Sequence, residues 1–234
     1  MAVESINTQE QALILDELLQ IGTAAHATYD RPPYPDMLDF ARAGAAVGGT
    51  SATLEKTRAL AEYFRSLDDD DLRRAAVFMT GRPFGPSKRS TLGLGWSTLS
   101  KVVGAISSRD DDELQLLFRK HSDFGDWAGE ALEGRTDNGD VPLEEVEQTL
   151  EAIRTARGVA KTAPLEKLLR RLHPLAARFV VKIISGEMRI GLSEGLVEAA
   201  IAEAFGQPVT KVKGVHLITG DIGETAVRIL GLNK

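Results

Sequence analysis

The stretch that decides the fold is KIISGEMRIGLSEGLVEAAIAEAFG, residues 182–206. Apolar residues recur at helical spacing on both sides of a central break, so the pattern predicts two buried helices joined by a turn. The break contains Gly186, Arg189, Gly191 and Ser193. An arginine between two glycines is an unusual occupant of a turn between buried helices, and it raises the question of what this turn contacts.

Helical periodicity also dominates the rest of the chain. Two-residue alternation, which is typical of strands, is scarce, and its best case, VHLIT at 215–219, is short and isolated. The sequence therefore predicts an all-α fold in a single multi-helix domain. Helices are expected at 8–20, 53–67, 71–80, 98–107, 113–121, 143–155, 164–184 (with a second helix starting at Pro174) and 194–205.

The chain is expected to consist of two pseudo-symmetric helical halves, residues 1–135 and 136–234. Turn-forming residues at 133–142 separate an acidic stretch from a basic one at this boundary. Residues 92–103 align without gaps on 190–201, which matches LGL with IGL. The similarity predicts two equivalent glycine turns on related surfaces, although ordinary helix-hairpin similarity remains an alternative.

The composition favours a cytoplasmic protein that is not membrane-bound. Of 234 residues, 43% are hydrophobic, but no apolar run approaches the roughly 20 residues of a membrane helix. There is no cysteine, and the N-terminal sequence lacks the pattern of a signal peptide. The net charge of −6 is unevenly distributed along the chain. The segment from Arg154 to Arg189 contains nine basic residues and only two acidic ones. A second window, from Arg82 to Lys101, has four basic residues and no acidic one.

The glycine turns could bind phosphate. At the start of a helix the backbone N–H groups lack intrahelical partners, and the helix dipole favours an anion there. Glycine lets a ligand approach the backbone closely, and Arg189 could clamp a phosphate or enter a narrow groove. The alternative is structural: Gly186 would cap a helix, Gly191 would be a tight packing point and Arg189 a surface residue.

Three motifs together carry a family resemblance: SGEMRIGLSEGLVEAAIAEAF, the upstream LGLGWSTLSKVV and the downstream GDIGETA at 220–226. In this order and spacing they resemble the N-terminal DNA-binding domain of ATP-dependent DNA ligases, over roughly residues 35–230. The resemblance implies an all-helical domain that lies along the minor groove of nicked duplex DNA and binds its backbone without base specificity. Matched by position, the DNA-binding residues would be Gly186, Arg189, Gly191 and Ser193 in the second half, Gly93 and Gly95 in the first half, and Thr50, Ser51 and Thr162 at helix starts.

The chain departs from the family pattern in two ways. Glu187 stands where members often carry a basic residue. The nucleotidyl-transfer signature, a lysine followed by x-Asp-Gly, is missing, and the chain stops at LGLNK before nucleotidyltransferase and OB domains would begin. The resemblance thus implies that ATP and magnesium serve the parent enzyme in DNA repair, replication and recombination. This chain is expected to have no cofactor and no catalytic residue of its own, as a fragment or as a stand-alone relative.

No other group of residues predicts catalysis or metal binding. The four histidines, His26, His121, His173 and His216, are scattered at unrelated spacings. The aspartates at 68–71 are expected to complement the dipole of the helix that follows them.

The main alternative function is that of a helical-repeat module for protein–protein interaction, in which the basic turns would be incidental. Trp96, beside the first glycine turn, could stack on a sugar or a base, but core packing is the favoured interpretation.

Overall fold

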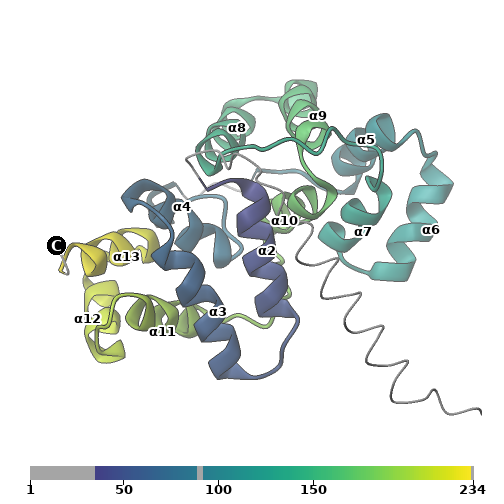
Figure 1. The fold of residues 1–234 in the computed structure, drawn as a ribbon. Coiled ribbons are helices and arrows are strands. Elements are labelled where there is room, and N and C mark those ends of the chain that lie inside the picture. The colour runs from purple at the N-terminus through teal and green to yellow at the C-terminus, as the bar shows by residue number, and fades with distance from the viewer. Residues whose placement is uncertain (1–34, 89–91, 233–234) are drawn as a thin grey trace, which may run out of the picture. The chain divides into compact units, whose positions relative to one another are not determined.

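The computed structural model describes residues 35–88 and 92–232 and shows a fold built from α-helices (Figure 1). The described residues contain no β-sheet, only two isolated bridge pairs, so the predicted all-α class is confirmed. The helix expected at 8–20 lies outside the described residues. The elements are α2 (Met37–Gly48), α3 (Thr53–Arg65), α4 (Asp69–Met79), η1 (Pro86–Lys88), α5 (Trp96–Ser107), α6 (Asp111–His121), α7 (Phe124–Ala131), α8 (Leu143–Thr155), η2 (Gly158–Lys161), α9 (Thr162–Arg171), α10 (Pro174–Ser185), α11 (Glu194–Ala204), α12 (Val209–Thr219) and α13 (Ile222–Gly231).

The strand candidate at 215–219 forms the last part of helix α12. This helix begins after Pro208 and ends at Gly220, which adopts the left-handed conformation. It packs against α11 and α13. The strand candidate here is therefore wrong: the segment continues the helix, and Leu217 and Ile218 are exposed on its outer face. Helices α2, α7 and α13, which periodicity did not predict, are also present.

Aspartates cap many of the helices. The side chains of Asp36, Asp68, Asp110, Asp123 and Asp221 each accept a hydrogen bond from a backbone N–H in the first turn of the following helix. These caps satisfy amide groups that a helix start leaves without partners. The acidic run at 68–71 is therefore the start of a helix, as expected.

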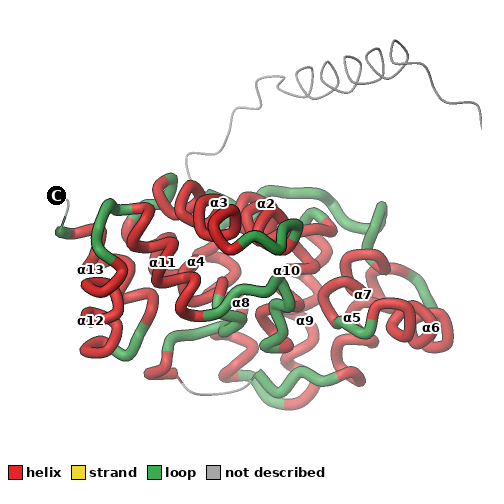
Figure 2. Tube along the Cα trace, turned by 90° about the horizontal axis from the view of Figure 1, so that it is seen from below, coloured by secondary structure: helices red, strands yellow, loops and turns green. Residues whose placement is uncertain are grey.

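The first packing group consists of α2, α3, α4, α11, α12 and α13. Helix α3 packs against α2 and α11, and α13 packs against α4 and α12. Figures 1 and 2 show α11, α12 and α13 together beside α3 and α4. Phe40, Phe64 and Phe78 are fully buried in this group.

The second packing group consists of α5 to α10 and η2. Helices α7 and α10 are in close contact because Gly125 leaves room for its neighbour: a Cβ atom at this position would lie 2.3 Å from Cγ of Lys182. Trp127 of α7 is fully buried, and its indole N–H donates a 3.0 Å hydrogen bond to the carbonyl of Leu114.

The two packing groups meet where α2 contacts α10 and where α4 contacts α8. At the first contact, a Cβ atom at Gly44 would lie 2.3 Å from the ring of Phe179, so glycine lets the helices approach. At the second, Glu147 of α8 pairs with Arg73 and Arg74 of α4. The division of the chain at residue 135 stays a prediction. Among the described residues, no helix is long and apolar enough to cross a membrane.

Candidate nucleic-acid interface

Two glycine turns have the same backbone geometry. The first turn, residues 92–95, leads into α5, and the second turn, residues 190–193, leads into α11. Their glycines, Gly93 and Gly191, have φ angles of 62° and 63°, in the left-handed region that favours glycine. The residues that precede the helices, Gly95 and Ser193, have φ angles of −98° and −94°. The alignment of LGL with IGL therefore corresponds to a repeated local structure.

The segments that enter the two turns also match. Gly81 follows α4 and Gly186 follows α10, with φ angles of 75° and 74°. A Cβ atom at Gly81 would lie 3.4 Å from the carbonyl oxygen of Gly186. The two helix ends are therefore neighbours, and Gly186 ends α10 as a left-handed cap.

The two helix starts differ in their caps. The hydroxyl of Ser193 accepts a 3.3 Å hydrogen bond from the N–H of Leu196 at the start of α11. Gly95, at the start of α5, has no side chain and provides no such cap. A Cβ atom at Gly95 would meet no atom within 4 Å, so this backbone is open to approach. The first turn thus leaves helix-start amides available to an external acceptor.

A lysine fixes each turn from a distant part of the chain. The ammonium of Lys56, on α3, donates hydrogen bonds of 2.6 Å to the carbonyl of Ile190 and 3.0 Å to that of Gly191. The ammonium of Lys161, in η2, donates a 2.6 Å hydrogen bond to the carbonyl of Leu92. In both turns the acceptor is the carbonyl of the residue before the left-handed glycine. Sequence reasoning did not assign these lysines to the site, because nothing local signals a contact between segments so far apart.

Arg189 lies beside the second turn and has several partners. Its φ angle is 48°, which is uncommon outside glycine. Its guanidinium donates a 2.8 Å hydrogen bond to the carbonyl of Ser122 and pairs with Glu187 at 2.6 Å, and its Nε lies 3.9 Å from a carboxylate oxygen of Asp123. The side chain is still 53% exposed. The acid noted in the sequence thus partly neutralises the arginine that was predicted to bind phosphate.

The aspartate beside Arg189, Asp123, is itself part of a buried ion pair with Lys182. Lys182 of α10 is only 2% exposed, and its ammonium lies 2.8 Å from both carboxylate oxygens of Asp123 and 3.0 Å from Asp126. Burial alone would raise the pKa of Asp126, but Lys182 and Arg178 outweigh it and hold that pKa below its usual range. The Ser122–Asp123 junction, which Arg189 also contacts, is therefore fixed to α10.

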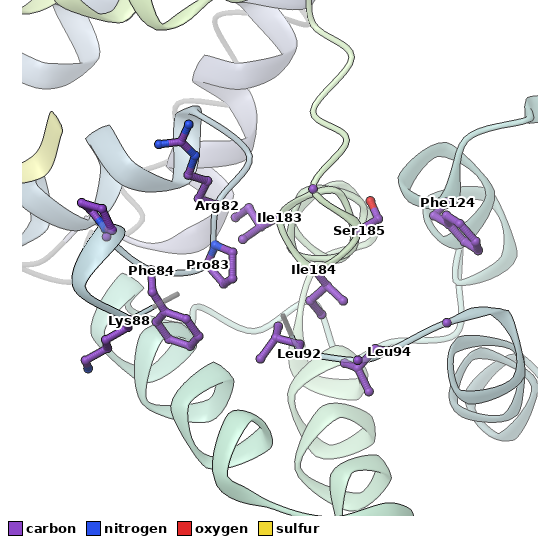
Figure 3. Close-up of a pocket in the computed structure, with 15 residues that line it drawn as sticks. Arg82, Pro83, Phe84, Lys88, Leu92, Leu94, Phe124, Ile183, Ile184 and Ser185 are labelled. Atoms are coloured by element: carbon purple, nitrogen blue, oxygen red, sulfur yellow. The ribbon is translucent and has the colours of Figure 1, made fainter. Parts of the chain in front are cut away.

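A hollow of about 790 Å³ lies between the first turn and the end of α10 (Figure 3). Gly93 and Gly95 line it from the first turn, and Gly186 lines it from the end of α10. Its apolar side chains come mainly from the segment after α4, the segment before α5, and α10: Pro83, Phe84, Leu92, Leu94, Ile183 and Ile184. Residues of both predicted halves thus share one surface.

The other predicted site residues adjoin these turns. Thr162 begins α9 and lines a second hollow of about 450 Å³ with Gly93, Lys101 and Lys161. Thr50 lies in the loop before α3, where its hydroxyl donates to the carboxylate of Glu55 and accepts a 3.1 Å hydrogen bond from Ala52.

This loop adjoins the second turn, because a Cβ atom at Gly48 would lie 3.1 Å from the side chain of Ile190. Ser51 is exposed in the same loop. The structure therefore places Gly93, Gly95 and Thr162 around the first turn. It places Thr50, Ser51, Gly186, Arg189, Gly191 and Ser193 in or beside the second turn.

Comparison with known proteins identifies the family. A family model described as the DNA ligase N terminus matches residues 37–202. The chain belongs to this family. The matched range contains both glycine turns and the two lysines that fix them. The resemblance inferred from the sequence motifs is thereby confirmed.

Three relatives show how much of a DNA ligase is matched. A probable DNA ligase of Koribacter versatilis is 34% identical over 184 residues, which are 78% of this chain and 32% of that protein. A probable DNA ligase of Opitutus terrae is 32% identical over 241 residues, which cover 88% of this chain and 24% of that protein. A DNA ligase of Methanothermobacter thermautotrophicus is 32% identical over 186 residues, which cover 76% of this chain and 33% of that protein. The chain thus spans about a third or less of the length of these relatives.

The basic surface of this DNA ligase N-terminal domain is weaker than its sequence suggests. Most of the basic residues between Arg154 and Arg189 pair with an acid, often on another helix. The side chains of Arg157 and Lys167 have no hydrogen bond or ion pair with any described residue. The paired residues are Arg154 with Glu151, Arg170 with Glu166, Arg171 with Glu145, Arg178 with Asp126, Lys182 with Asp123 and Arg189 with Glu187.

Trp96 is half-buried and packs against the core, as favoured from the sequence. Its ring centroid lies 5.1 Å from those of Phe118 and Trp127 and 6.4 Å from that of Phe124. These contacts hold the N-terminal end of α5 against α6 and α7. Within residues 35–88 and 92–232, no group of three or more histidine, aspartate or glutamate side chains could hold a metal ion.

Proposed function

We propose that this domain binds nicked duplex DNA without sequence preference, through the minor groove and the phosphate backbone, as the DNA-binding part of an ATP-dependent DNA ligase. The observation that carries the proposal is the repeated glycine turn, with left-handed glycines at 62° and 63° before α5 and α11. Membership of the DNA ligase N terminus family supports the same function. The parent enzyme would act in DNA repair, replication and recombination in the cytoplasm, at the nucleoid in a prokaryotic cell.

Each turn would contact the DNA backbone rather than the bases. Backbone N–H groups beside a glycine and at a helix start bind phosphate oxygens without reading sequence. The turn at Gly93 and Gly95 and the turn at Gly191 and Ser193 would each engage one stretch of backbone. Arg189 would reach the groove between them with its exposed guanidinium.

The ATP and magnesium implied by the ligase resemblance do not fit the residues of this chain. None of its lysines is followed by x-Asp-Gly. Its described carboxylates form no group that could hold a metal ion. We therefore assign nucleotidyl transfer to a nucleotidyltransferase domain of the same polypeptide, and this domain contributes affinity and positioning. Incubation with labelled ATP and magnesium should leave the chain unlabelled after denaturing electrophoresis, and a labelled lysine would contradict this assignment.

Fluorescence anisotropy with labelled DNA tests the binding function. With about five to six phosphates neutralised, log K against log salt should have a slope near −5, a loss of about 10³ in affinity between 50 and 200 mM salt. A nicked duplex and its scrambled-sequence counterpart should bind equally. A clear preference for one sequence would contradict the proposal. A flat salt response would favour the alternative, a helical module for protein–protein interaction.

A further inference from the structure

The two glycine turns share a contact with a lysine ammonium in the same position. Lys56 lies 134 residues before its acceptor Ile190, and Lys161 lies 69 residues after its acceptor Leu92. One lysine is on an α-helix and the other is in a 3-10 helix. Both nevertheless donate a 2.6 Å hydrogen bond to the carbonyl before the left-handed glycine. Two unrelated elements thus place a cation at the same point beneath the same backbone conformation.

Neither ammonium has a carboxylate partner among the described residues. Lys56 is only 8% exposed, and carbonyl oxygens are its only acceptors there. Lys182, the other buried lysine, shows the usual arrangement, in which two aspartates surround the ammonium. A buried charge without a counter-charge is costly, because the protein interior solvates it poorly. The ammonium of Lys56 therefore carries a buried charge without a counter-charge, which an anionic ligand at the second turn would offset.

The backbone of each turn directs donors away from the lysine. In a trans peptide the C=O and the following N–H point in opposite directions, and the described residues contain no cis peptide. The Ile190 carbonyl faces Lys56, so the N–H of Gly191 faces away from it. The Leu92 carbonyl faces Lys161, so the N–H of Gly93 faces away in the same manner. Neither N–H has an acceptor among the described residues. Each turn therefore has an unpaired N–H donor on one side of a peptide and a lysine ammonium on the other side.

We propose that Lys56 and Lys161 are a matched pair of residues that prepare the two glycine turns for DNA phosphates. This inference rests on the proposed DNA-binding function. Lys161 is part-exposed and lines the hollow that Gly93, Lys101 and Thr162 share, so its ammonium would also contact a phosphate that enters this hollow. Lys56 is a positioning residue: it holds the second turn through two carbonyls and adds positive charge beneath it.

The test replaces each lysine with methionine, which keeps most of the length of the side chain and removes the charge. In 0.1 M salt, Lys161→Met should weaken duplex binding about eightfold and make the salt slope less steep by about 1, since one fewer phosphate is neutralised. Lys56→Met should weaken binding about as much. Lys161→Arg, which keeps the charge, should restore the slope.

Matched controls separate this effect from a general loss of positive charge. Arg58 is exposed on α3, close to Lys56, and Lys213 is exposed on α12; neither side chain has a hydrogen bond or ion pair with a described residue. Arg58→Met and Lys213→Met should each change affinity less than twofold. Circular dichroism and urea unfolding check that all variants are folded. If Lys56→Met does not fold, the slope of log K against log salt for Lys161→Met still tests the inference.

Two results would contradict the inference in distinguishable ways. If the wild-type domain binds with the expected salt slope and both lysine variants match their controls, the inference is wrong while the proposed function stands. If the wild-type domain shows no salt-dependent binding, the proposed function fails and the inference fails with it. Weaker binding of folded Lys56→Met and Lys161→Met, with controls unchanged, supports both.

Discussion

The guanidinium of Arg189 lies 2.6 Å from the carboxylate of Glu187, two residues before it in the same loop. In the proposed complex with DNA, this acid would compete for the arginine and repel phosphate. Glu187→Gln should therefore increase affinity for duplex DNA by about threefold to tenfold, as expected for one screened charge near a protein surface. Anisotropy titrations at 50 mM salt would measure the change. Glu203→Gln, at the other end of α11, is the control, and an equal gain there would show an effect of net charge alone.

Reversal of the charge at Arg189 should have the opposite effect. Arg189→Glu should weaken DNA binding by about 2 to 4 kcal/mol, because a charged contact is lost and a repulsion is added. The variant also loses the hydrogen bond to the carbonyl of Ser122. Circular dichroism should confirm that the fold is retained. Binding equal to that of the wild type would assign this loop a purely structural role.

A methyl group at the two turn glycines should have unequal effects on stability. Gly93→Ala and Gly191→Ala both force alanine into a left-handed conformation, at a cost of about 1 to 2 kcal/mol. At Gly191 the new Cβ would lie 2.5 Å from the Lys56 ammonium, whereas at Gly93 the nearest atom, the Lys161 ammonium, is 3.4 Å away. Gly191→Ala should therefore lower the free energy of unfolding more than Gly93→Ala. Urea titrations would compare the two, and equal losses would contradict the described packing of Lys56.

The contact between α4 and α8 should depend on pH through Glu147. Its carboxylate accepts hydrogen bonds from Arg73 at 3.2 Å and from Arg74 at 2.9 Å. Burial alone would raise the pKa of Glu147, but the two arginines outweigh it and lower that pKa. The ionised form is therefore favoured in the folded state. Its stabilisation is present above the unfolded pKa of about 4.3 and is lost as pH falls through the lower folded value.

Glu147→Gln should accordingly reduce the free energy of unfolding by about 1 to 3 kcal/mol at pH 7. The difference from the wild type should shrink as the pH falls below about 4. Urea unfolding at several pH values would measure it. A difference that stays constant from pH 7 to pH 3 would contradict the assigned role of the carboxylate.

The buried pair of Lys182 and Asp123 should be among the most sensitive positions of the domain. Asp123→Asn keeps a side-chain acceptor for the start of α7 but removes the main counter-charge of Lys182. Loss of one member of a buried ion pair typically costs about 3 to 5 kcal/mol, and the remaining contact with Asp126 favours the lower value. Thermal unfolding followed by circular dichroism would show this loss. The exposed Asp112→Asn on α6 should have little effect.

Much of the helical fold could be predicted from the sequence, because helical periodicity is a local property of the chain. The helix started by Pro174 and the left-handed cap at Gly186 follow from residue types and their order. Helix α12 was less predictable. Valine and isoleucine near its end favour a strand locally, yet this segment continues the helix that packs against α11 and α13, with Leu217 and Ile218 exposed.

The candidate site could be predicted only in part. Both turns could be located because LGL aligns with IGL in the sequence, and the glycine of each has the left-handed conformation that favours this residue. Lys56 could not be found in this way, since its acceptor lies 134 residues further along the chain. The charge of the basic window was overestimated for the same reason. Counting residues along a segment cannot show that Arg171 pairs with Glu145 on another helix.

The contact of Gly44 with Phe179 has a consequence for the distance between the two turns. Each packing group carries one turn, and the groups meet where this glycine lets α2 approach α10. Phosphates follow one another at a fixed spacing along each strand of a duplex. Two binding turns can therefore contact the same duplex only when the distance between them matches that spacing. If the two turns bind DNA as proposed, the missing methyl group at Gly44 helps to set the distance between them, and a larger residue there would change that distance without touching either turn.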